Sequence, residues 1–399
     1  MLTRGFDPAL SVGSARPAVF RTSTYVFSSP EAAERAFNVV SGRQKAAPGE
    51  RIDLIYSRFN HPNAEILEDQ IVPLEAGATA AVVFNSGMAA IMTAILAFAR
   101  PGSTIIYTVP LYGGTQSLMH DFLEPLGIAG IAVRAGSGDE LDAAIAGAEN
   151  PSIVLIETPA NPTMTMTDIR RASNTAARLA TPPLVMVDNT FLGPSFQHPL
   201  KLGADVVLYS ATKYLSGFSD MIAGVAIGKR EELIAKIRSK RGLFGNILQP
   251  DECWMLDNRL PTVSLRMNRA SKNAQRIAER LVNHPKVKRV YYPTLFQDAE
   301  QIRIRIAQCD FPGAMISLEL RGGKQAAFEF LRNVKIGRNA VSLGGVETLL
   351  CHPKTTTHSS LTPEEMEVAG ITDGLVRISV GIEDWRDLVA DFEQALEMA

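Results

Sequence analysis

A lysine follows closely behind an apolar run in the segment LYSATKYLSGFSD, residues 208–220. The run has the pattern of a strand that ends at Ser210, and Lys213 comes next, across a short turn closed by Gly217. A lysine at a strand end either stays in contact with water as an ordinary surface charge or faces a cleft. In a cleft its charge would lose hydration, which is unfavourable unless the amine has a catalytic or binding role. Because a lysine amine with a lowered pKa forms Schiff bases with carbonyl compounds, Lys213 is the first candidate catalytic residue.

Two further strand ends carry polar residues. The apolar run LVMVDNT contains Asp188, which is either a turn or cap residue or a carboxylate held ready for a cationic ring nitrogen. Upstream, Asn85, Ser86 and Gly87 join a strand to a long apolar helix. A helix N-terminus can hold a phosphate, and a glycine there lets the phosphate approach the backbone, although many Ser-Gly turns are only caps.

The combination is more informative than any single member. Ser210 and Thr212 supply hydroxyls for a phosphate, Lys213 an amine for an aldehyde, and Asp188 a partner for a pyridinium nitrogen. These are the groups that pyridoxal phosphate requires of a protein. The sequence therefore predicts pyridoxal phosphate as the cofactor.

The elements that must position these residues form an α/β pattern. From residue 80 onward, short apolar strands alternate with helical segments, which predicts a mostly parallel sheet covered on both faces. In such folds ligands bind beyond the carboxyl ends of the strands. After about residue 255, a long helix at 262–285, strands near KRVYYP, AMISLEL, AVSLGG and LVRISVG, and a closing amphipathic helix predict a smaller α+β domain.

The first sixty residues have a different character. They hold several prolines and glycines with little periodicity, which predicts an extended arm with one short helix near residues 30–39. Such an arm has little core of its own, so we expect residues 1–60 to pack on a neighbouring subunit. The expected division is then an arm (1–60), a cofactor-binding domain (61–255) and a C-terminal domain (256–399).

Composition excludes several classes of protein. The chain has 399 residues, 46% hydrophobic and 21% charged, and a net charge of −2, so no global charge draws it to nucleic acid or to anionic membranes. The longest apolar stretch, residues 87–99, is too short to span a bilayer and is expected to form a buried helix. Because the N-terminus lacks the pattern of a secretory signal, we expect a cytoplasmic protein.

No metal site is expected. The three cysteines are odd in number and widely spaced, which fits neither a disulfide framework nor a CxxC metal site and favours three reduced, partly buried thiols. His61, His352 and His358 have no ligand spacing that supports a metal.

Eight segments then carry a family resemblance. The chain resembles the Cys/Met-metabolism family of pyridoxal-phosphate enzymes, which includes cystathionine γ-synthase, cystathionine γ-lyase, methionine γ-lyase and the homoserine sulfhydrylases. The resemblance covers nearly the whole chain from about Ser14. It rests on YSRFNHPN, FNSGMAAI, PLYGGT, ETPANPT, VDNTF, SATKYLSG, AVSLGGVETL and LVRISVGIED.

The resemblance implies a fold and a site. The fold would be that of fold-type-I pyridoxal-phosphate transferases, with a seven-stranded, mostly parallel sheet and a smaller α+β domain. A homo-oligomer would follow, expected to be a tetramer built from two dimers whose subunits share active sites. Roles would fall on matching positions: Lys213 would carry the cofactor, Asp188 would hold its ring nitrogen, Asn161 would hold its ring hydroxyl and Tyr112 would stack on the ring. The cofactor phosphate would be held by Gly87, Met88, Ser210 and Thr212 of the same subunit and by Tyr56 and Arg58 of a neighbouring subunit. Arg377, with help from Ser342, would bind the substrate carboxylate.

The reaction implied is γ-elimination or γ-replacement on an amino acid. Lys213 would move the α-proton and then a β-proton, and Tyr112 would protonate the leaving γ-substituent. The resulting product would either hydrolyse to a 2-oxo acid and ammonia or accept a nucleophile. Both outcomes use the same residues, so the choice depends on the rest of the pocket.

Two departures alter the substrate side of the pocket. Gly114 stands where methionine γ-lyases usually have a reactive cysteine, and Phe218 stands where much of the family has a histidine. We therefore expect a γ-lyase acting on a γ-substituted homoserine-type amino acid, with an oxygen-linked substrate such as canavanine among the candidates. The alternative is γ-replacement on an acylated homoserine, as in cystathionine γ-synthase or an O-acylhomoserine sulfhydrylase.

Hypotheses of other classes have less support. A non-catalytic binding module on this fold would not need Lys213, Asp188 and Arg377 together. A nicotinamide-binding Rossmann enzyme would need a GxGxxG turn after the first strand, and this turn lacks it.

Overall fold

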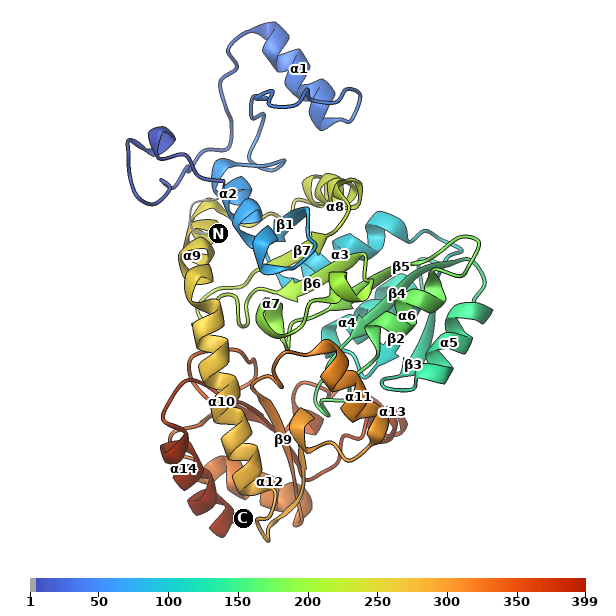
Figure 1. Cartoon of the computed structure of the whole chain (residues 1–399), viewed down its shortest axis with the longest axis vertical. Helices are drawn as coiled ribbons and strands as arrows, with labels where there is room; N and C mark the ends of the chain where they lie inside the picture. The colour runs from blue at the N-terminus through green and yellow to red at the C-terminus, as the bar shows by residue number, and fades with distance from the viewer. Residues whose placement is uncertain (1–4) are drawn as a thin grey trace.

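The computed structural model describes residues 5–399 and contains two β-sheets (Figure 1). The larger sheet has seven strands in the order β1-β7-β6-β5-β4-β2-β3. Strand β7 runs antiparallel to both of its neighbours and all other pairs are parallel, which confirms the predicted seven-stranded, mostly parallel sheet. The strands are β1 (Ala80–Phe84), β2 (Thr104–Val109), β3 (Ala129–Arg134), β4 (Pro151–Glu157), β5 (Leu184–Asp188), β6 (Val206–Ser210) and β7 (Gly224–Gly228).

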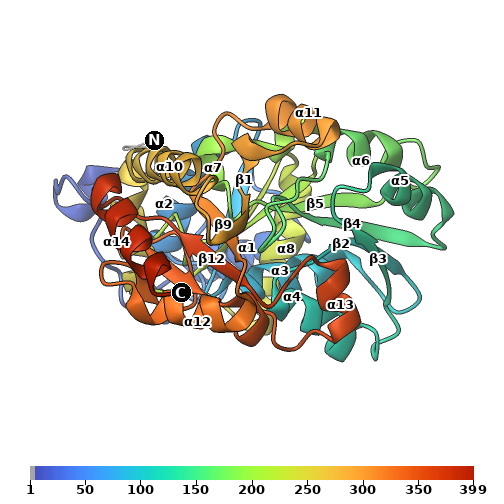
Figure 2. The same ribbon diagram turned by 90° about the horizontal axis from the view of Figure 1, so that it is seen from below.

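Helices cover both faces of this sheet, so its strands are apolar on both sides. Along β1, Val82 and Phe84 face one hydrophobic core, whereas Ala81 and Val83 face the other. Figure 2 shows α5 and α6 on one face and α3 and α4 on the opposite face. The helices of this region are α2 (Pro62–Ile71), α3 (Gly87–Phe98), α4 (Gly113–Ser117), α5 (Gly138–Gly147), α6 (Ile169–Ala176), α7 (Gly193–Phe196), α8 (Glu231–Phe244) and α9 (Pro250–Arg259).

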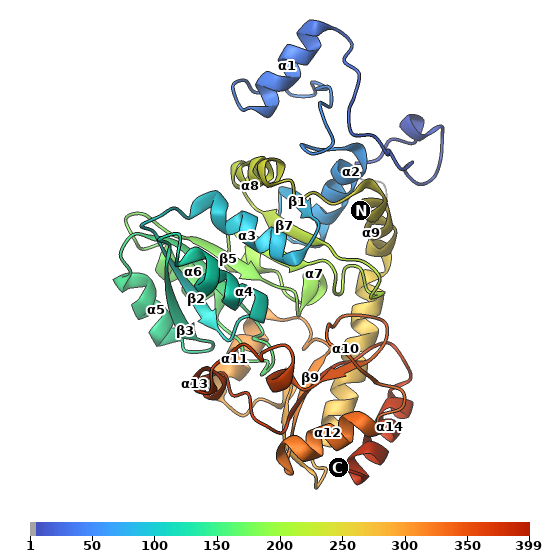
Figure 3. The same cartoon turned by 180° about the vertical axis from the view of Figure 1, so that it is seen from behind.

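The second sheet has five strands in the order β10-β11-β12-β9-β8. The long helix α10 runs from the end of α9 along this sheet, as Figure 3 shows, and α12 packs against α14. The elements are α10 (Val263–Leu281), β8 (Val287–Tyr291), α11 (Ala299–Gln308), β9 (Met315–Leu320), α12 (Gly323–Asn333), β10 (Arg338–Asn339), β11 (Leu349–Cys351), α13 (Pro363–Val368), β12 (Leu375–Ser379) and α14 (Trp385–Glu397).

One predicted strand of this sheet is wrong. The segment AVSLGG, residues 340–345, is irregular, and only the two residues before it form β10. The backbone of Ser342 has φ +87° and that of Gly344 has φ +76°, values that a strand does not contain. The segment bends because it passes against the backbone of Lys213, as described below.

The N-terminal segment extends away from both sheets (Figure 1). From residue 5 up to α2 it contains one α-helix, α1 (Pro30–Val40), which confirms the helix predicted near residues 30–39. Ser29 caps that helix by accepting a hydrogen bond from Ala32 N. Apolar side chains along the segment remain exposed, among them Val26, Phe37 and Val40. The chain thus presents an uncovered apolar surface at this end.

Candidate active site

The carboxyl ends of β4, β5 and β6 open into one cavity of about 670 Å³. Glu157, Asp188 and Ser210 are the last residues of these three strands, and each lines the cavity. Parallel strands end at the same edge of a sheet, which is why side chains so far apart in the sequence meet here. The cavity also receives these residues from the predicted site: Gly87, Met88, Tyr112, Gly114, Asn161, Thr212, Lys213, Ser342 and Arg377.

Lys213 is largely enclosed in this cavity. Its Nζ donates a hydrogen bond of 2.7 Å to Ser342 Oγ. Burial lowers the pKa of the Lys213 amine to about 8, and the nearby positive charge of Arg377 acts in the same direction. The turn that carries Lys213 closes through Gly217 N, which donates to Lys213 O at 2.7 Å. An amine with this pKa is partly neutral near pH 8 and can act as a nucleophile or accept a proton.

Gly344 explains how the irregular segment reaches Lys213. A Cβ at Gly344 would lie 2.7 Å from Tyr214 N and 3.0 Å from the carbonyl carbon of Lys213. The segment therefore needs a glycine at this contact, and it brings Ser342 from the second sheet's region to the lysine amine.

Asp188 is partly buried beside Thr190. Its Oδ1 accepts hydrogen bonds from Thr190 Oγ1 at 2.6 Å and from Thr190 N at 3.0 Å. Burial raises the pKa of Asp188, and the two bonds from Thr190 partly oppose that rise. Both bonds end on Oδ1, so Oδ2 accepts no hydrogen bond from residues 5–399 and can face a bound ligand.

The start of α3 has the features of a site that could hold a phosphate. The N-cap Ser86 accepts a hydrogen bond from Ala89 N, and the first N–H groups of a helix lack intrahelical partners. At Gly87 a Cβ would come within 2.8 Å of Ser210 Cβ, so only glycine lets the helix approach β6 this closely. Thr212 Oγ1 is fixed between the backbone N–H and carbonyl of Ala223. Free N–H groups, two hydroxyls and a positive helix end thus converge on one corner of the cavity.

Arg377 enters the cavity from β12 of the second sheet. Its Nη1 donates to Asn161 Oδ1 at 3.2 Å and its Nη2 to Ser342 O at 2.9 Å. The guanidinium is buried, and its Nε has no hydrogen-bond partner within the described part of the chain. A buried cation with an unused donor is suited to a carboxylate ligand.

Three predicted site residues lie outside the cavity of this chain. Tyr56 is exposed, with 41% of its surface accessible. Arg58 is exposed too, and its guanidinium donates to Gly242 O and lies 4.7 Å from the centre of the Phe59 ring. Phe218 is also exposed, and the guanidinium of Arg259 stacks on its ring at 5.0 Å.

Several cavity residues were not predicted from the sequence. Glu157 and Thr190 line the cavity beside Asp188, and Thr357 lines another part of its wall. The signal for Glu157 was present, because it ends an apolar strand in the same way as Asp188 does. Thr190 follows Asp188 by two residues, a spacing at which an aspartate commonly accepts a hydrogen bond from the backbone.

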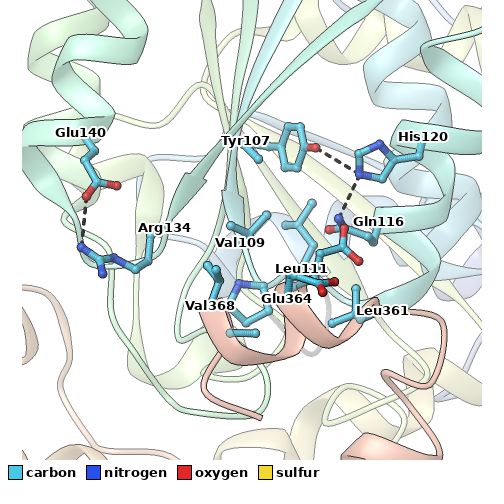
Figure 4. Close-up of a pocket in the computed structure, with 14 residues that line it drawn as sticks. Tyr107, Val109, Leu111, Gln116, His120, Arg134, Glu140, Leu361, Glu364 and Val368 are labelled. Atoms are coloured by element: carbon cyan, nitrogen blue, oxygen red, sulfur yellow. Dashed lines mark hydrogen bonds and ion pairs between the residues drawn. The ribbon is translucent and has the colours of Figure 1, made fainter.

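A second cavity, of about 570 Å³, lies between α13 and the strands β2 and β3 (Figure 4). His120 is central on one side, where its Nε2 lies 3.0 Å from Gln116 Nε2 and 3.5 Å from Tyr107 Oη. At the other side Arg134 pairs with Glu140. This cavity lacks a lysine and a strand-end carboxylate, so its chemistry does not match that of a Schiff-base site.

The described part of the chain contains neither a candidate metal site nor a helix that could span a membrane. Among residues 5–399 no cluster of three or more His, Cys, Asp or Glu side chains could hold a metal ion. No helix in that same range is long and apolar enough to cross a membrane.

The larger cavity fits pyridoxal phosphate. The glycine contact at Gly87 leaves room and N–H groups for a phosphate, and Lys213 presents an amine of lowered pKa to an aldehyde. Asp188 has a carboxylate oxygen that could face a ring nitrogen, and the unpaired Arg377 Nε could bind a substrate. No residue of the described cavity wall contradicts this fit.

Comparisons with known proteins agree. The model of the Cys/Met metabolism PLP-dependent enzymes matches residues 2–397. The chain is 41% identical over 387 residues to an L-methionine gamma-lyase of Fusobacterium nucleatum, and the alignment covers 96% of this chain and 94% of the relative. It is 42% identical over 342 residues to a cystathionine beta-lyase of Bacillus subtilis, and that alignment covers 86% of each chain. A crystal structure of cystathionine gamma synthase from Xanthomonas oryzae pv. oryzae in complex with cystathionine superposes with a TM-score of 0.89 at 32% identity, covering 100% of this chain and 96% of the other. The chain belongs to the Cys/Met metabolism PLP-dependent enzymes, and pyridoxal phosphate is its cofactor.

Proposed function

We propose that the protein catalyses γ-elimination on a γ-substituted homoserine-type amino acid, releasing the γ-substituent, a 2-oxo acid and ammonia. The observation that carries this proposal is the charge of the cavity wall. Among the described residues that line it, only Glu157, Asp188, Lys213 and Arg377 are charged. With Asp188 engaged by the cofactor and Arg377 by the substrate carboxylate, this chain provides no further cation for the carboxylate of a second amino acid. A replacement reaction with cysteine would need one.

The wall beyond Lys213 supports an uncharged γ-substituent. It consists of apolar side chains, including Ile222 and Val341, and of neutral hydroxyl groups. A methionine-like thioether suits the apolar part. An oxygen-linked group such as that of canavanine could use the hydroxyls of Ser117, Thr357 and Ser360 as hydrogen-bond acceptors, so it belongs to the same class of candidates.

The residues would divide the work as follows. The bound cofactor supplies an electron sink that stabilises negative charge at the substrate α-carbon. Arg377 would bind the substrate carboxylate, with Ser342 fixing the guanidinium through its carbonyl. The Lys213 amine would take the proton from Cα, give that proton up to the bound cofactor and, neutral again, take one from Cβ. Tyr112 would give its hydroxyl proton to the leaving γ-substituent. Gly114 lies against Tyr112, since a Cβ there would come within 2.8 Å of the Tyr112 ring, so a larger side chain at this position would shift Tyr112.

The remaining cofactor contacts follow the same proposal. Asp188 would keep the ring nitrogen protonated, and Asn161 would bind the ring hydroxyl. The phosphate would be held by Gly87, Met88, Ser210 and Thr212. Phe218 is proposed to contribute to the substrate side from its exposed position.

We also propose that the arm completes the site of a neighbouring subunit. Residues 1–60 carry exposed apolar side chains, and both Tyr56 and Arg58 are exposed at the end of this arm. A symmetric dimer in which Tyr56 and Arg58 reach the neighbour's phosphate would cover them, and two such dimers would form a tetramer. Residues 61–255 would then form the cofactor-binding domain and residues 256–399 the C-terminal domain.

A substrate panel tests the reaction. The purified enzyme is incubated with methionine, homocysteine, cystathionine, canavanine and O-succinylhomoserine, each with and without cysteine, and products are identified by mass. The expected result is a 2-oxo acid from at least one γ-substituted amino acid alone. Consumption of O-succinylhomoserine only when cysteine is present, with cystathionine as product and no elimination from any amino acid alone, would refute the lyase and establish replacement.

A further inference from the structure

Glu157 forms a pair of carboxylates with Asp188 on adjacent strands. The two residues are register partners at the ends of β4 and β5, so their side chains emerge side by side on one face of the sheet. Only 6% of the Glu157 surface is exposed. Two neighbouring acids, one buried and one partly buried, repel each other, so this arrangement needs a compensating function.

The Glu157 carboxyl group joins two segments that belong to different walls of the cavity. Its Oε2 accepts a hydrogen bond of 2.7 Å from Tyr112 N, and its Oε1 accepts one of 3.2 Å from Asn161 N. Tyr112 stands before the first turn of α4, and Asn161 lies in the loop after β4. Neither N–H belongs to a sheet or helix ladder, so Glu157 is what fixes both.

The effect of Glu157 extends to the substrate side through Asn161. The amide oxygen of Asn161 accepts a hydrogen bond from Arg377 Nη1 at 3.2 Å. One carboxyl group therefore links the Tyr112 wall, the Asn161 loop and the guanidinium of Arg377. A shift of Glu157 would move groups on both sides of the cavity together.

The electrostatic environment of Glu157 makes a carboxyl group costly at this position. Burial and the negative charge of Asp188 raise the pKa of Glu157 to about 8, while the two N–H bonds and Arg377 act in the opposite direction. A glutamine would avoid the repulsion. However, its side chain has a single acceptor oxygen, and its NH₂ group would face one of the two backbone N–H groups. The geometry thus requires two acceptors on one side chain.

We propose that Glu157 is a positioning residue that holds Tyr112 and Asn161 at the distance the bound cofactor and substrate require. The inference rests on the proposed function in taking Tyr112 and Asn161 as the residues that contact the cofactor. Glu157 itself acts through them.

The variant Glu157→Gln tests this inference, with Glu75→Gln as the matched control. Glu75 is another buried carboxylate that accepts one backbone N–H, from Leu200 at 3.3 Å, and one hydroxyl, from Tyr209 at 3.0 Å, but it does not line the cavity. Glu157→Gln is expected to reduce kcat/KM about 10- to 100-fold, to weaken cofactor binding and to change the visible circular dichroism of the bound cofactor. Glu75→Gln is expected to lower the melting temperature while kcat/KM and the dichroism stay within about twofold.

Two outcomes overturn the inference. One is a Glu157→Gln enzyme whose dichroism, cofactor affinity and kcat/KM match those of the wild type. The other is a loss of kcat/KM and of cofactor affinity in Glu75→Gln equal to the loss in Glu157→Gln. Glu157 would then contribute only to the overall stability of the fold. If the wild type eliminates nothing while Glu157→Gln still changes the dichroism and cofactor affinity, the proposed function fails and the positioning role stands.

Hydrogen exchange gives a second measurement that needs no variant. In the wild-type protein without cofactor, the Tyr112 and Asn161 amides are expected to exchange slowly even though neither belongs to a helix or strand ladder. If both exchange as fast as the amides of exposed loops, the two hydrogen bonds do not hold these segments and the inference is wrong.

Discussion

Four charged side chains share the larger cavity, and their mutual electrostatics determine which of them holds a proton. Lys213 and Arg377 repel each other, which helps to lower the pKa of the lysine amine to about 8. Asp188 and Glu157 repel each other in turn, and burial raises the pKa of both. At the residue scale the site is thus arranged so that its amine can lose a proton near neutral pH and one carboxyl group can keep a proton.

The lowered pKa of Lys213 predicts a pH-dependent stability. The folded pKa, about 8, lies below the ordinary value of 10.5, so between these pH values the unfolded chain binds more protons than the folded one. The stability of the cofactor-free protein should therefore rise with pH across this window, relative to Lys213→Met. The test compares the melting temperatures of both proteins from pH 7 to 10.5. If the difference in melting temperature between the two proteins stays constant with pH, or changes in the opposite direction, the pKa of the Lys213 amine is not lowered in the folded protein.

Arg377 should not tolerate a lysine. A lysine ammonium cannot bind Asn161 Oδ1, Ser342 O and a substrate carboxylate with the planar geometry of a guanidinium. Arg377→Lys is expected to lower kcat/KM about 10- to 100-fold, mainly through a higher KM. Arg386→Lys, which alters an exposed arginine paired with Asp384, serves as control and should leave both constants unchanged. An unchanged KM in Arg377→Lys would remove this residue from substrate binding.

At the scale of elements, the close approach of α3 to β6 builds the phosphate corner. Gly87→Ala would place a Cβ 2.8 Å from Ser210 Cβ, and the helix or the strand end must then move. We expect a loss of about 1–3 kcal/mol in the free energy of unfolding, together with weaker cofactor binding. Gly147→Ala in α5 is the control, because a Cβ there meets nothing within 4 Å. Equal cofactor affinity in the Gly87→Ala and wild-type proteins would contradict the proposed phosphate site.

The elements also show what the sequence can and cannot predict. Lys213, Asp188 and Ser210 could be located because each follows a run of apolar residues, and strand ends of a parallel sheet meet. The edge strand β3 (Ala129–Arg134) has no continuous apolar run by which the sequence could predict it, because most of its side chains are exposed or half-buried. The strand predicted at residues 340–345 was wrong because tertiary contact with Lys213 overrides the local preference for extended structure. The pairing of Glu157 with Asp188 depends on strand register, which one sequence does not reveal.

At the scale of the whole molecule, the arm extends away from both sheets and carries exposed apolar side chains. Its exposed apolar side chains and the exposed Tyr56 and Arg58 support sites shared between subunits. Complementation tests this. Lys213→Ala and Arg58→Ala are each expected to have low activity. In an equal mixture refolded together, about half of the dimers contain one chain of each variant, and one of the two sites in such a dimer carries neither substitution. The mixture should therefore recover about a quarter of the wild-type sites. Activity of the mixture no higher than that of the separate variants would refute shared sites.

The central claim is that the amine of Lys213 carries the cofactor covalently. The direct measurement is reduction of the purified enzyme with borohydride, followed by proteolysis and mass spectrometry of the peptides. The account predicts one added phosphopyridoxyl group per chain, located on Lys213, and none in Lys213→Ala. A label on another lysine, or an unlabelled Lys213 in an enzyme that retains its cofactor, would contradict it.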